Sequence, residues 1–176
     1  MNKITYLQEK NSSRKIEELL GKSKKTGIKG STAYFIKEII FQNGDGSFPN
    51  DAKGIFEYFE KGVLLHAFKS TSNYFIPLPF STLNKIILTK GKESVNLIFL
   101  SPMWTLLKVG LSIDLARYFA LGGEYKIEET TLEIISENLK MRLITNGYAF
   151  KGQERFFSQL EIGGHLEINK TIPILK

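Results

Sequence analysis

The two histidines, His66 and His165, are the first residues to examine for acid–base chemistry. A catalytic histidine needs a nucleophile or a carboxylate within reach. His66 lies inside an apolar run, however, and His165 lies in a glycine-rich turn. With no cysteine in the chain and no pair of histidines at ligand spacing, we predict no thiolate nucleophile, no zinc site and no cofactor.

Carboxylates leave one catalytic alternative. Five glutamates have the alternation of a solvated sheet face, and they are Glu124, Glu128, Glu129, Glu133 and Glu137. A glycosidase-like pair is defined by the separation of two carboxyl groups in space and needs no sequence motif. A small carboxylate-dependent enzyme therefore stays an alternative, although the residues favour a protein without catalytic activity.

Two short stretches resemble ligand-binding loops but lack residues that define them. The sequence GKS at positions 21–23 looks like the end of a phosphate-binding loop, yet Ile16 occupies the place of the first glycine. The run 43–51 has oxygen-bearing residues at alternate positions, as a calcium loop does. Phe48 replaces the turn glycine of such a loop, and Gly54 replaces its last glutamate. We predict no metal site here, and a surface turn at 43–51.

The positive charge of the chain is concentrated in residues 1–30. This segment contains eight lysines and arginines against three glutamates, which gives +5 of the +6 net charge, and residues 31–176 are close to neutral. Clustered lysine beside glycine and serine can follow the phosphates of nucleic acid or of an anionic membrane, or can serve only to keep a solvated segment soluble. The candidate binding residues are Lys22, Lys24, Lys25 and Lys29.

Aromatic residues supply a second set of candidates. Thirteen Phe and seven Tyr form a surplus that either fills a core or offers rings to a partner. Such rings would dock a protein or an apolar ligand, or would stack bases in a nucleic-acid binder. The candidates are Tyr74, Phe75, Phe80 and Trp104.

The elements that must position these residues are mostly strands. Residues 107–115 are apolar at every odd position, and this period of two predicts a strand with one buried face. Patterns and turn residues predict further strands at 54–59, 63–68, 74–78, 83–89, 94–100, 125–128, 131–136, 139–145 and 166–168. Residues 31–42 read as a strand or as a buried short helix. Short helices are expected from Ser12 to Gly21, capped by Ser13, and at 153–160.

We therefore predict a mainly β fold of the β-rich α+β class. Turns at short spacing favour a single antiparallel sheet that curls or closes into a small barrel, because so many strands would otherwise leave long exposed edges. Residues 1–30 would be a basic N-terminal segment with a short helix, and residues 31–176 one β-rich domain. The sequence does not distinguish an open sheet from a closed barrel.

A resemblance covers residues 54 to about 160. The sequences KGIFEYFEKGVLL at 53–65 and FIPLPFSTLNKIIL at 75–88 resemble the early strands of bacterial PH-like and GRAM-like domains, and RLITNGYAF at 142–150 is similar to their last strand. The resemblance implies a small barrel plugged by a helix, with docking of lipid headgroups or peptides in place of catalysis. Phosphoinositide binders of this kind carry a basic cluster in the first hairpin loop, whereas this chain has only EKG at 60–62.

The function expected from these features is a non-catalytic docking module for a protein or other macromolecular partner. The alternatives are a nucleic-acid binder that uses the basic segment, contact with an anionic membrane surface, and the carboxylate enzyme. We see no signal peptide, and the longest charge-free apolar stretch, 94–107, is shorter than the roughly 18 residues of a transmembrane helix. A cytoplasmic protein is therefore expected. Exposed strand edges are compatible with a homo-oligomer, but the sequence does not determine the oligomeric state.

Overall fold

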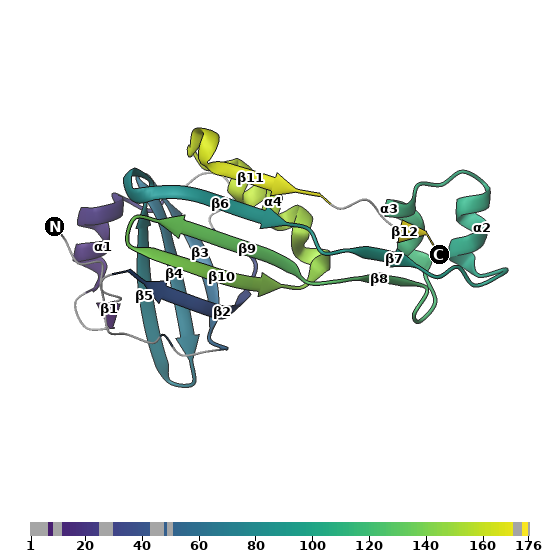
Figure 1. The fold of residues 1–176 in the computed structure, drawn as a ribbon, viewed down its shortest axis with the longest axis horizontal. Coiled ribbons are helices and arrows are strands. Elements are labelled where there is room, and N and C mark those ends of the chain that lie inside the picture. Colours follow the sequence, from purple (N-terminus) through teal and green to yellow (C-terminus); the bar gives the residue numbers. More distant parts are fainter. Residues whose placement is uncertain are drawn as a thin grey trace.

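The structure is a computed structural model that describes residues 7–8, 12–24, 30–42, 48, 51–170 and 174–175. It shows a β-rich body from which an arm extends at one end (Figure 1). The body contains a nine-stranded sheet, and the arm contains a three-stranded sheet and helices. The prediction of a mainly β protein is confirmed.

The body sheet has the strand order β1-β5-β4-β3-β2-β10-β9-β6-β11. Its strands are β1 (Leu7–Gln8), β2 (Tyr34–Phe41), β3 (Lys53–Phe59), β4 (Gly62–Lys69), β5 (Ser72–Pro79), β6 (Leu83–Thr89), β9 (Thr130–Ser136), β10 (Leu139–Thr145) and β11 (Leu166–Asn169). Residues 31–42 therefore contain a strand, β2. The predicted turn at 43–51 lies almost wholly outside the described residues.

The prediction of a single antiparallel sheet or closed barrel is corrected in two respects. Strand β11 pairs with β6 in parallel, so the sheet is mixed, and β1 and β11 form its two separate edges. The parallel pairing arises because helix α4 (Phe150–Ser158) forms part of the crossover from β10 to β11, and β11 then lies beside β6. A crossover of this kind brings a strand back in the same direction, whereas a tight hairpin reverses it.

The body core lies between the inner sheet face and α4. Residues of β9 alternate between buried and half-buried positions, as the period of two requires. Phe156 and Phe157 of α4 are fully buried, and the Phe157 ring meets the Phe56 ring edge-on with centroids 5.7 Å apart. The helix expected at 153–160 is thus confirmed, although it begins earlier, at Phe150, and a 3-10 turn, η3 (Gly147–Ala149), leads into it.

Helix α1 (Ser12–Leu20) packs on the other face of the sheet. Ile16 and Leu20 form a small buried cluster with Phe59 and Leu64. The helix ends at Gly21, whose φ of 74° is the left-handed conformation that glycine adopts without strain. The predicted N-terminal helix is confirmed, and the side chain of its predicted cap, Ser13, lies outside the described residues.

The arm is a hairpin insertion at the end of the body sheet. Strand β7 (Glu93–Val95) continues outward from β6, and β8 (Tyr125–Ile127) leads back into β9 (Figure 1). The short strand β12 (Ile174–Leu175) pairs in parallel with β7. We call residues 90–95 and 125–129 the neck, and residues 96–124 the distal lobe. The lobe contains α2 (Pro102–Lys108), α3 (Ile113–Ala116) and the 3-10 helix η2 (Arg117–Phe119).

The strand predicted at 107–115 is wrong, because this stretch contains the end of one helix, a turn and the start of another. Leu107 lies in the last turn of α2, Gly110 has a φ of 90° that breaks the chain direction, and Leu115 lies in α3. The odd positions therefore do not share a face, since Leu107, Leu111 and Ile113 pack in the lobe while Val109 and Leu115 are exposed. Ser101 before Pro102 is a strong helix-start signal, and it outweighs a period of two over only nine residues.

The region 90–100 also differs from its prediction. Of the strand expected at 94–100, only Ser94 and Val95 lie in a strand, β7, and the following residues form the loop that begins the distal lobe. Residues 90–92, which follow the strand expected at 83–89, carry the chain straight from β6 into β7.

Candidate docking surface

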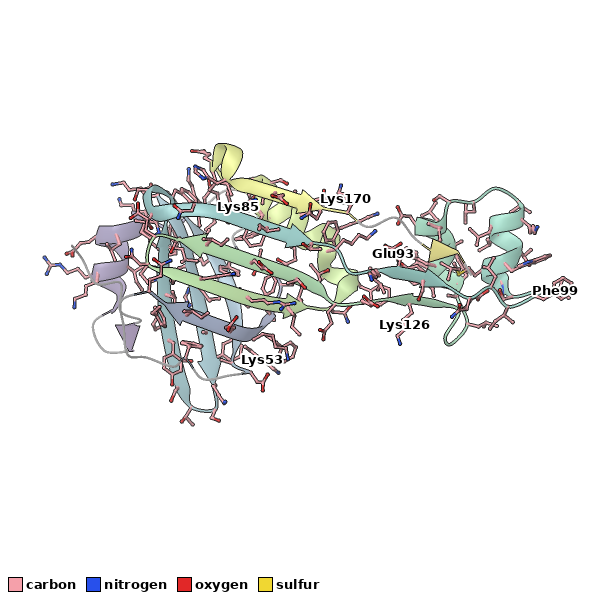
Figure 2. The ribbon with its side chains drawn as sticks, viewed as in Figure 1. Lys53, Lys85, Glu93, Phe99, Lys126 and Lys170 are labelled. Carbon is pink, nitrogen blue, oxygen red and sulfur yellow. The ribbon has the colours of Figure 1, made fainter. Side chains whose placement is uncertain are left out.

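Exposed apolar side chains are concentrated on the distal lobe. Among the described residues, nine of the fifteen large hydrophobic residues with exposed side chains lie between positions 97 and 121. They are Leu97, Ile98, Phe99, Leu100, Val109, Leu115, Tyr118, Phe119 and Leu121. Phe99 and Leu100 are 74% and 68% exposed, and Figure 2 shows Phe99 at the free end of the arm. Apolar surface gathered in this way marks interaction sites in soluble proteins.

The tip of the lobe is built from a loop and the first turns of α2. The Phe99 ring meets the ring of the half-buried Trp104 edge-on, with centroids 5.1 Å apart. The ammonium of Lys108 lies 5.6 Å from the centre of the same indole. Leu100 has a φ of 60°, a conformation that is strained for a residue with a side chain. The loop therefore presents Phe99 and Leu100 in a backbone geometry that the rest of the lobe must hold.

A buried carboxylate holds this loop in place. Glu124 is fully buried and accepts hydrogen bonds from the Ser101 hydroxyl, from the Leu121 amide at 3.0 Å and from the Ile98 amide at 3.2 Å. Ser101 in turn caps α2 by accepting from the Trp104 amide at 2.9 Å. Burial raises the pKa of Glu124, but the three hydrogen bonds outweigh burial and leave this pKa below its ordinary value.

Further polar contacts connect the lobe to the body. Asp114 of α3 accepts from Lys151 of α4 at 3.4 Å and lies 3.7 Å from a guanidinium nitrogen of Arg117. Arg117 donates to the Tyr125 hydroxyl at 3.2 Å. Burial raises the pKa of Tyr125, and the hydrogen bond from Arg117 acts in the opposite direction. The Asp114–Lys151 contact joins the lobe to the body, and the Arg117–Tyr125 contact joins the lobe to the neck.

The predicted aromatic site is divided between the body and the lobe. Trp104 contributes to the lobe tip, whereas the other three candidates are half-buried on the body. The Tyr74 ring packs against Phe48 with centroids 5.2 Å apart, and Phe75 packs against the α1 cluster. Phe80 packs against the body core. The structure thus brings Trp104 together with Phe99, which sequence reasoning missed. The available signal was the position of Phe99 just before the capped start of α2, because an apolar residue outside a helix or strand has no sheet to cover it.

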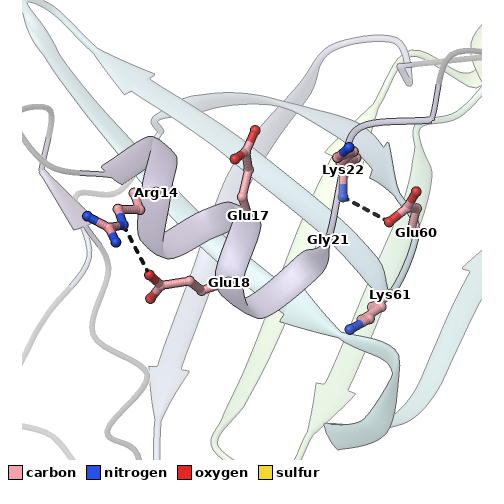
Figure 3. Close-up of a pocket in the computed structure, with 7 residues that line it drawn as sticks. All are labelled: Arg14, Glu17, Glu18, Gly21, Lys22, Glu60 and Lys61. Atoms are coloured by element: carbon pink, nitrogen blue, oxygen red, sulfur yellow. Dashed lines mark hydrogen bonds and ion pairs between the residues drawn. The ribbon is translucent and has the colours of Figure 1, made fainter.

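The predicted basic site contributes to a groove of balanced charge. Between α1 and the β3–β4 turn lies an open groove of about 430 Å³ (Figure 3). It is lined by Arg14, Glu17, Glu18, Gly21, Lys22, Glu60 and Lys61. Three cations face three carboxylates there, and the Lys22 amide donates to Glu60 at 3.1 Å. Lys24 lies 4.0 Å from Glu161 and over the Tyr58 ring, and the predicted residues Lys25 and Lys29 lie outside the described residues.

A serine, a glutamate and a histidine meet on the body surface. Ser23 donates to one oxygen of Glu57 at 2.6 Å, and Nε2 of His66 lies 2.9 Å from the other. The carboxylate therefore stands between the hydroxyl and the imidazole. In a nucleophilic triad the imidazole must stand in the centre so that it can accept the hydroxyl proton. The arrangement instead joins β3 and β4 to the segment after α1.

The glutamate series does not form a continuous solvated face. Glu124 is buried, which corrects the prediction for this residue, because donors of the lobe surround its carboxylate. Glu128 and Glu129 are exposed at the neck, and Glu133 is half-buried on β9. Within the part of the chain that the structure describes, no three histidine, aspartate or glutamate side chains are grouped closely enough to hold a metal ion.

Comparison of the chain with models of protein families found no match, and comparison with curated proteins found none either. None of the helices in the described ranges has the length and apolar character needed to cross a bilayer. The structural features to be explained are therefore an open β-rich body and a rigidly held lobe with exposed apolar side chains.

Proposed function

We propose that the protein is a non-catalytic docking module that contacts a macromolecular partner through its distal lobe. The observation that carries this proposal is the gathering of nine exposed apolar side chains on one 25-residue stretch, 97–121, at the end of the arm. Burying such residues against a partner removes apolar surface from water, which is the main favourable contribution to most associations.

The way the lobe is held supports a role in recognition. Docking residues that are ordered before binding lose less conformational entropy when a partner arrives. Glu124 orders the loop that carries Phe99, and the contact between Asp114 and Lys151 ties the lobe to the body. The exposed set also includes Tyr118 and Phe119, and large aromatic residues are enriched among those that dominate binding energy.

The resemblance to PH-like and GRAM-like domains also favours docking. In the proposal, however, contact is made by the insertion between β7 and β8, and not by the short β3–β4 turn. The nucleic-acid alternative has less support, because carboxylates accompany the cations of the described N-terminal segment. Arg14 lies 3.5 Å from Glu18, and Lys24 lies 4.0 Å from Glu161.

Photocrosslinking in cells that make the protein tests the proposal. A benzoylphenylalanine is placed at Phe99 in one variant and at Phe35 in the control. Phe35 is a matched control because it is also an exposed phenylalanine, at 45%, but lies on β2 of the body. We expect adducts with lipid or protein from position 99 and few from position 35. Equal yields from the two positions would remove the basis for a docking lobe.

A further inference from the structure

We infer that the body binds ordered water between the first turn of α4 and the end of the sheet from which the arm extends, in a site formed by Tyr34, Gln153 and Thr130. The ligand of this site is a small neutral molecule that both donates and accepts hydrogen bonds. The inference concerns the body alone and is independent of the docking function. A change of residue type along the sheet, the position of α4 and three buried polar atoms support it.

The inner face of the sheet changes from apolar to polar in its last row before the neck. The row before it consists of buried aliphatic residues on four adjacent strands, namely Ile36, Leu143, Leu132 and Leu88. The last row lies two residues further along each strand, on the same face, and consists of Tyr34, Thr145, Thr130 and Lys90. A threonine side chain is shorter than a leucine side chain, so the middle of this row reaches less far toward α4.

The first turn of α4 lies over this polar row, at the end of the body that carries the arm (Figure 1). At the β6 end of the row, the Lys90 ammonium lies 5.9 Å from the centre of the Phe150 ring, which begins the helix. At the β2 end, the side chain of Gln153 is fully buried and lies near the Tyr34 hydroxyl. The helix therefore crosses the row, with the threonines of β9 and β10 between these two contacts.

Three polar atoms at this place have no hydrogen-bond partner among the described residues. They belong to fully buried side chains and are the Tyr34 hydroxyl, Oε1 of Gln153 and Oγ1 of Thr130. Their polar neighbours are already engaged, because the Gln153 amide nitrogen donates to the Thr32 hydroxyl, and the Thr145 hydroxyl donates to the Ala33 carbonyl at 2.7 Å. Buried polar groups without a protein partner are typically satisfied by ordered water.

The chemistry of the three atoms matches water. The glutamine oxygen only accepts hydrogen bonds, whereas each hydroxyl can donate and accept. Burial raises the pKa of Tyr34 well above its ordinary value and Gln153 lowers it only in part, so the phenol keeps its proton as a donor. A buried water makes about three hydrogen bonds. It can donate to Gln153 and form its other bonds with the hydroxyls of Tyr34 and Thr130.

Oxygen-17 relaxation dispersion of the solvent signal tests the inference on the full-length protein, because it counts water molecules that stay inside longer than the protein takes to tumble. Tyr34→Phe with Thr130→Val removes both hydroxyls and nearly keeps the side-chain shapes. We expect this double variant to lower the dispersion amplitude by about one water molecule, since only Gln153 is left to bind it.

Tyr148→Phe with Thr131→Val is the matched control. Tyr148 is 59% exposed, and Thr131 is half-buried on the opposite face of β9 from Thr130. The control should keep the amplitude of the parent protein. Equal amplitudes for the two double variants would overturn the inference.

A crystal structure of the parent protein gives a test that does not depend on how the variants fold. We expect an enclosed density peak below the first turn of α4, about 2.8 Å from at least two of the three polar atoms. A direct hydrogen bond between Tyr34 and Gln153 with no enclosed peak would overturn the inference. A peak with ligand distances of about 2.3–2.6 Å would also overturn it, because these are the distances of a bound calcium ion. Neither result affects the docking function, which rests on the lobe.

Discussion

At the scale of single residues, Glu124 has the largest structural role in the distal lobe. One carboxylate accepts hydrogen bonds from Ser101, Leu121 and Ile98, which come from both ends of the 96–124 insertion. Removing a buried partner costs more than a typical hydrogen bond contributes, because donors are left without acceptors. We therefore expect Glu124→Ala to destabilise the lobe by about 2–4 kcal/mol, measured by denaturant unfolding followed through Trp104 emission.

The same residue predicts a dependence on pH. The pKa of Glu124 in the folded protein lies below its ordinary value of 4.5. A carboxyl group whose pKa is lowered by folding stabilises the folded state fully above the unfolded pKa, and this stabilisation is lost as pH falls through the folded pKa. Lobe stability should therefore decrease below about pH 4.5. Glu124→Gln should show a shallower acid dependence in the same unfolding measurement. An acid dependence as steep as that of the parent protein would assign the effect to other carboxyl groups.

Glu124 also shows what residue types alone could not predict. Its spacing of four residues from Glu128 is typical of a solvated sheet face, and a glutamate is rarely buried. The three donors that stabilise its carboxylate come from a loop and a helix cap that form only when the lobe folds. His66 is the opposite case. It lies in the strand predicted at 63–68, which the structure contains as β4, and there it contacts Glu57.

At the scale of elements, the neck depends on close backbone contacts. A Cβ atom on Gly91 would lie 2.1 Å from the Glu128 carbonyl oxygen and 2.7 Å from that of Glu129. A Cβ atom on Gly147, at the start of η3, would also lie 2.1 Å from the Glu128 oxygen. The neck can thus pack against the end of the body only because Gly91 and Gly147, which have no Cβ atom, flank the carbonyl group of Glu128.

A substitution series tests this contact. Gly91→Ala and Gly147→Ala should each destabilise the protein by about 1–3 kcal/mol, because backbone atoms would have to move. Gly122→Ala is the control, since a Cβ atom there has no neighbour within 4 Å, and it should change stability by less than about 0.5 kcal/mol. Thermal unfolding of the three variants measures the difference. Equal midpoints for Gly91→Ala and Gly122→Ala would mean that the neck adjusts easily.

The sequence predicted well those strands for which the hydrophobic period and the flanking turn residues indicated the same structure. The strands expected at 83–89 and 139–145 match β6 and β10 at both ends. The stretch 107–115 failed because its period competes with helix signals at Ser101, Pro102 and Ser112. Side-chain periodicity over nine residues was thus weaker evidence than the cap and the proline that precede it.

At the scale of the whole molecule, the protein has separate body and lobe cores. The lobe cluster contains Val95, Met103, Ala116 and Tyr125, and the body cluster lies between α4 and the nine-stranded sheet. We expect Trp104 emission to report unfolding of the lobe at a lower denaturant concentration than far-ultraviolet circular dichroism reports for the body. Glu124→Ala should shift the emission transition only. Coincident transitions in the parent protein would show that the two parts unfold as one unit.

The β-rich class was predictable from strand patterns, but the arrangement of the molecule was not. An open mixed sheet follows from the pairing of β11 with β6, which joins segments that are far apart in the sequence. The lobe surface follows from a loop and two short helices, whereas the sequence predicted strands at 94–100 and 107–115. Of the predicted candidate residues that the structure describes, Trp104 alone lies on the proposed docking surface.

The parallel pairing of β11 and β12 has a consequence for protein synthesis. Leu166 pairs with Ile86, and Leu175 pairs with Val95. Ile86 and Val95 are therefore each synthesised 80 residues before the residue with which they pair. At about 5–20 residues per second, the outer edges of β6 and β7 wait for several seconds on the ribosome before they are paired. During that interval they can pair with another nascent chain. Slower translation of the last segment should therefore increase aggregation of newly made protein.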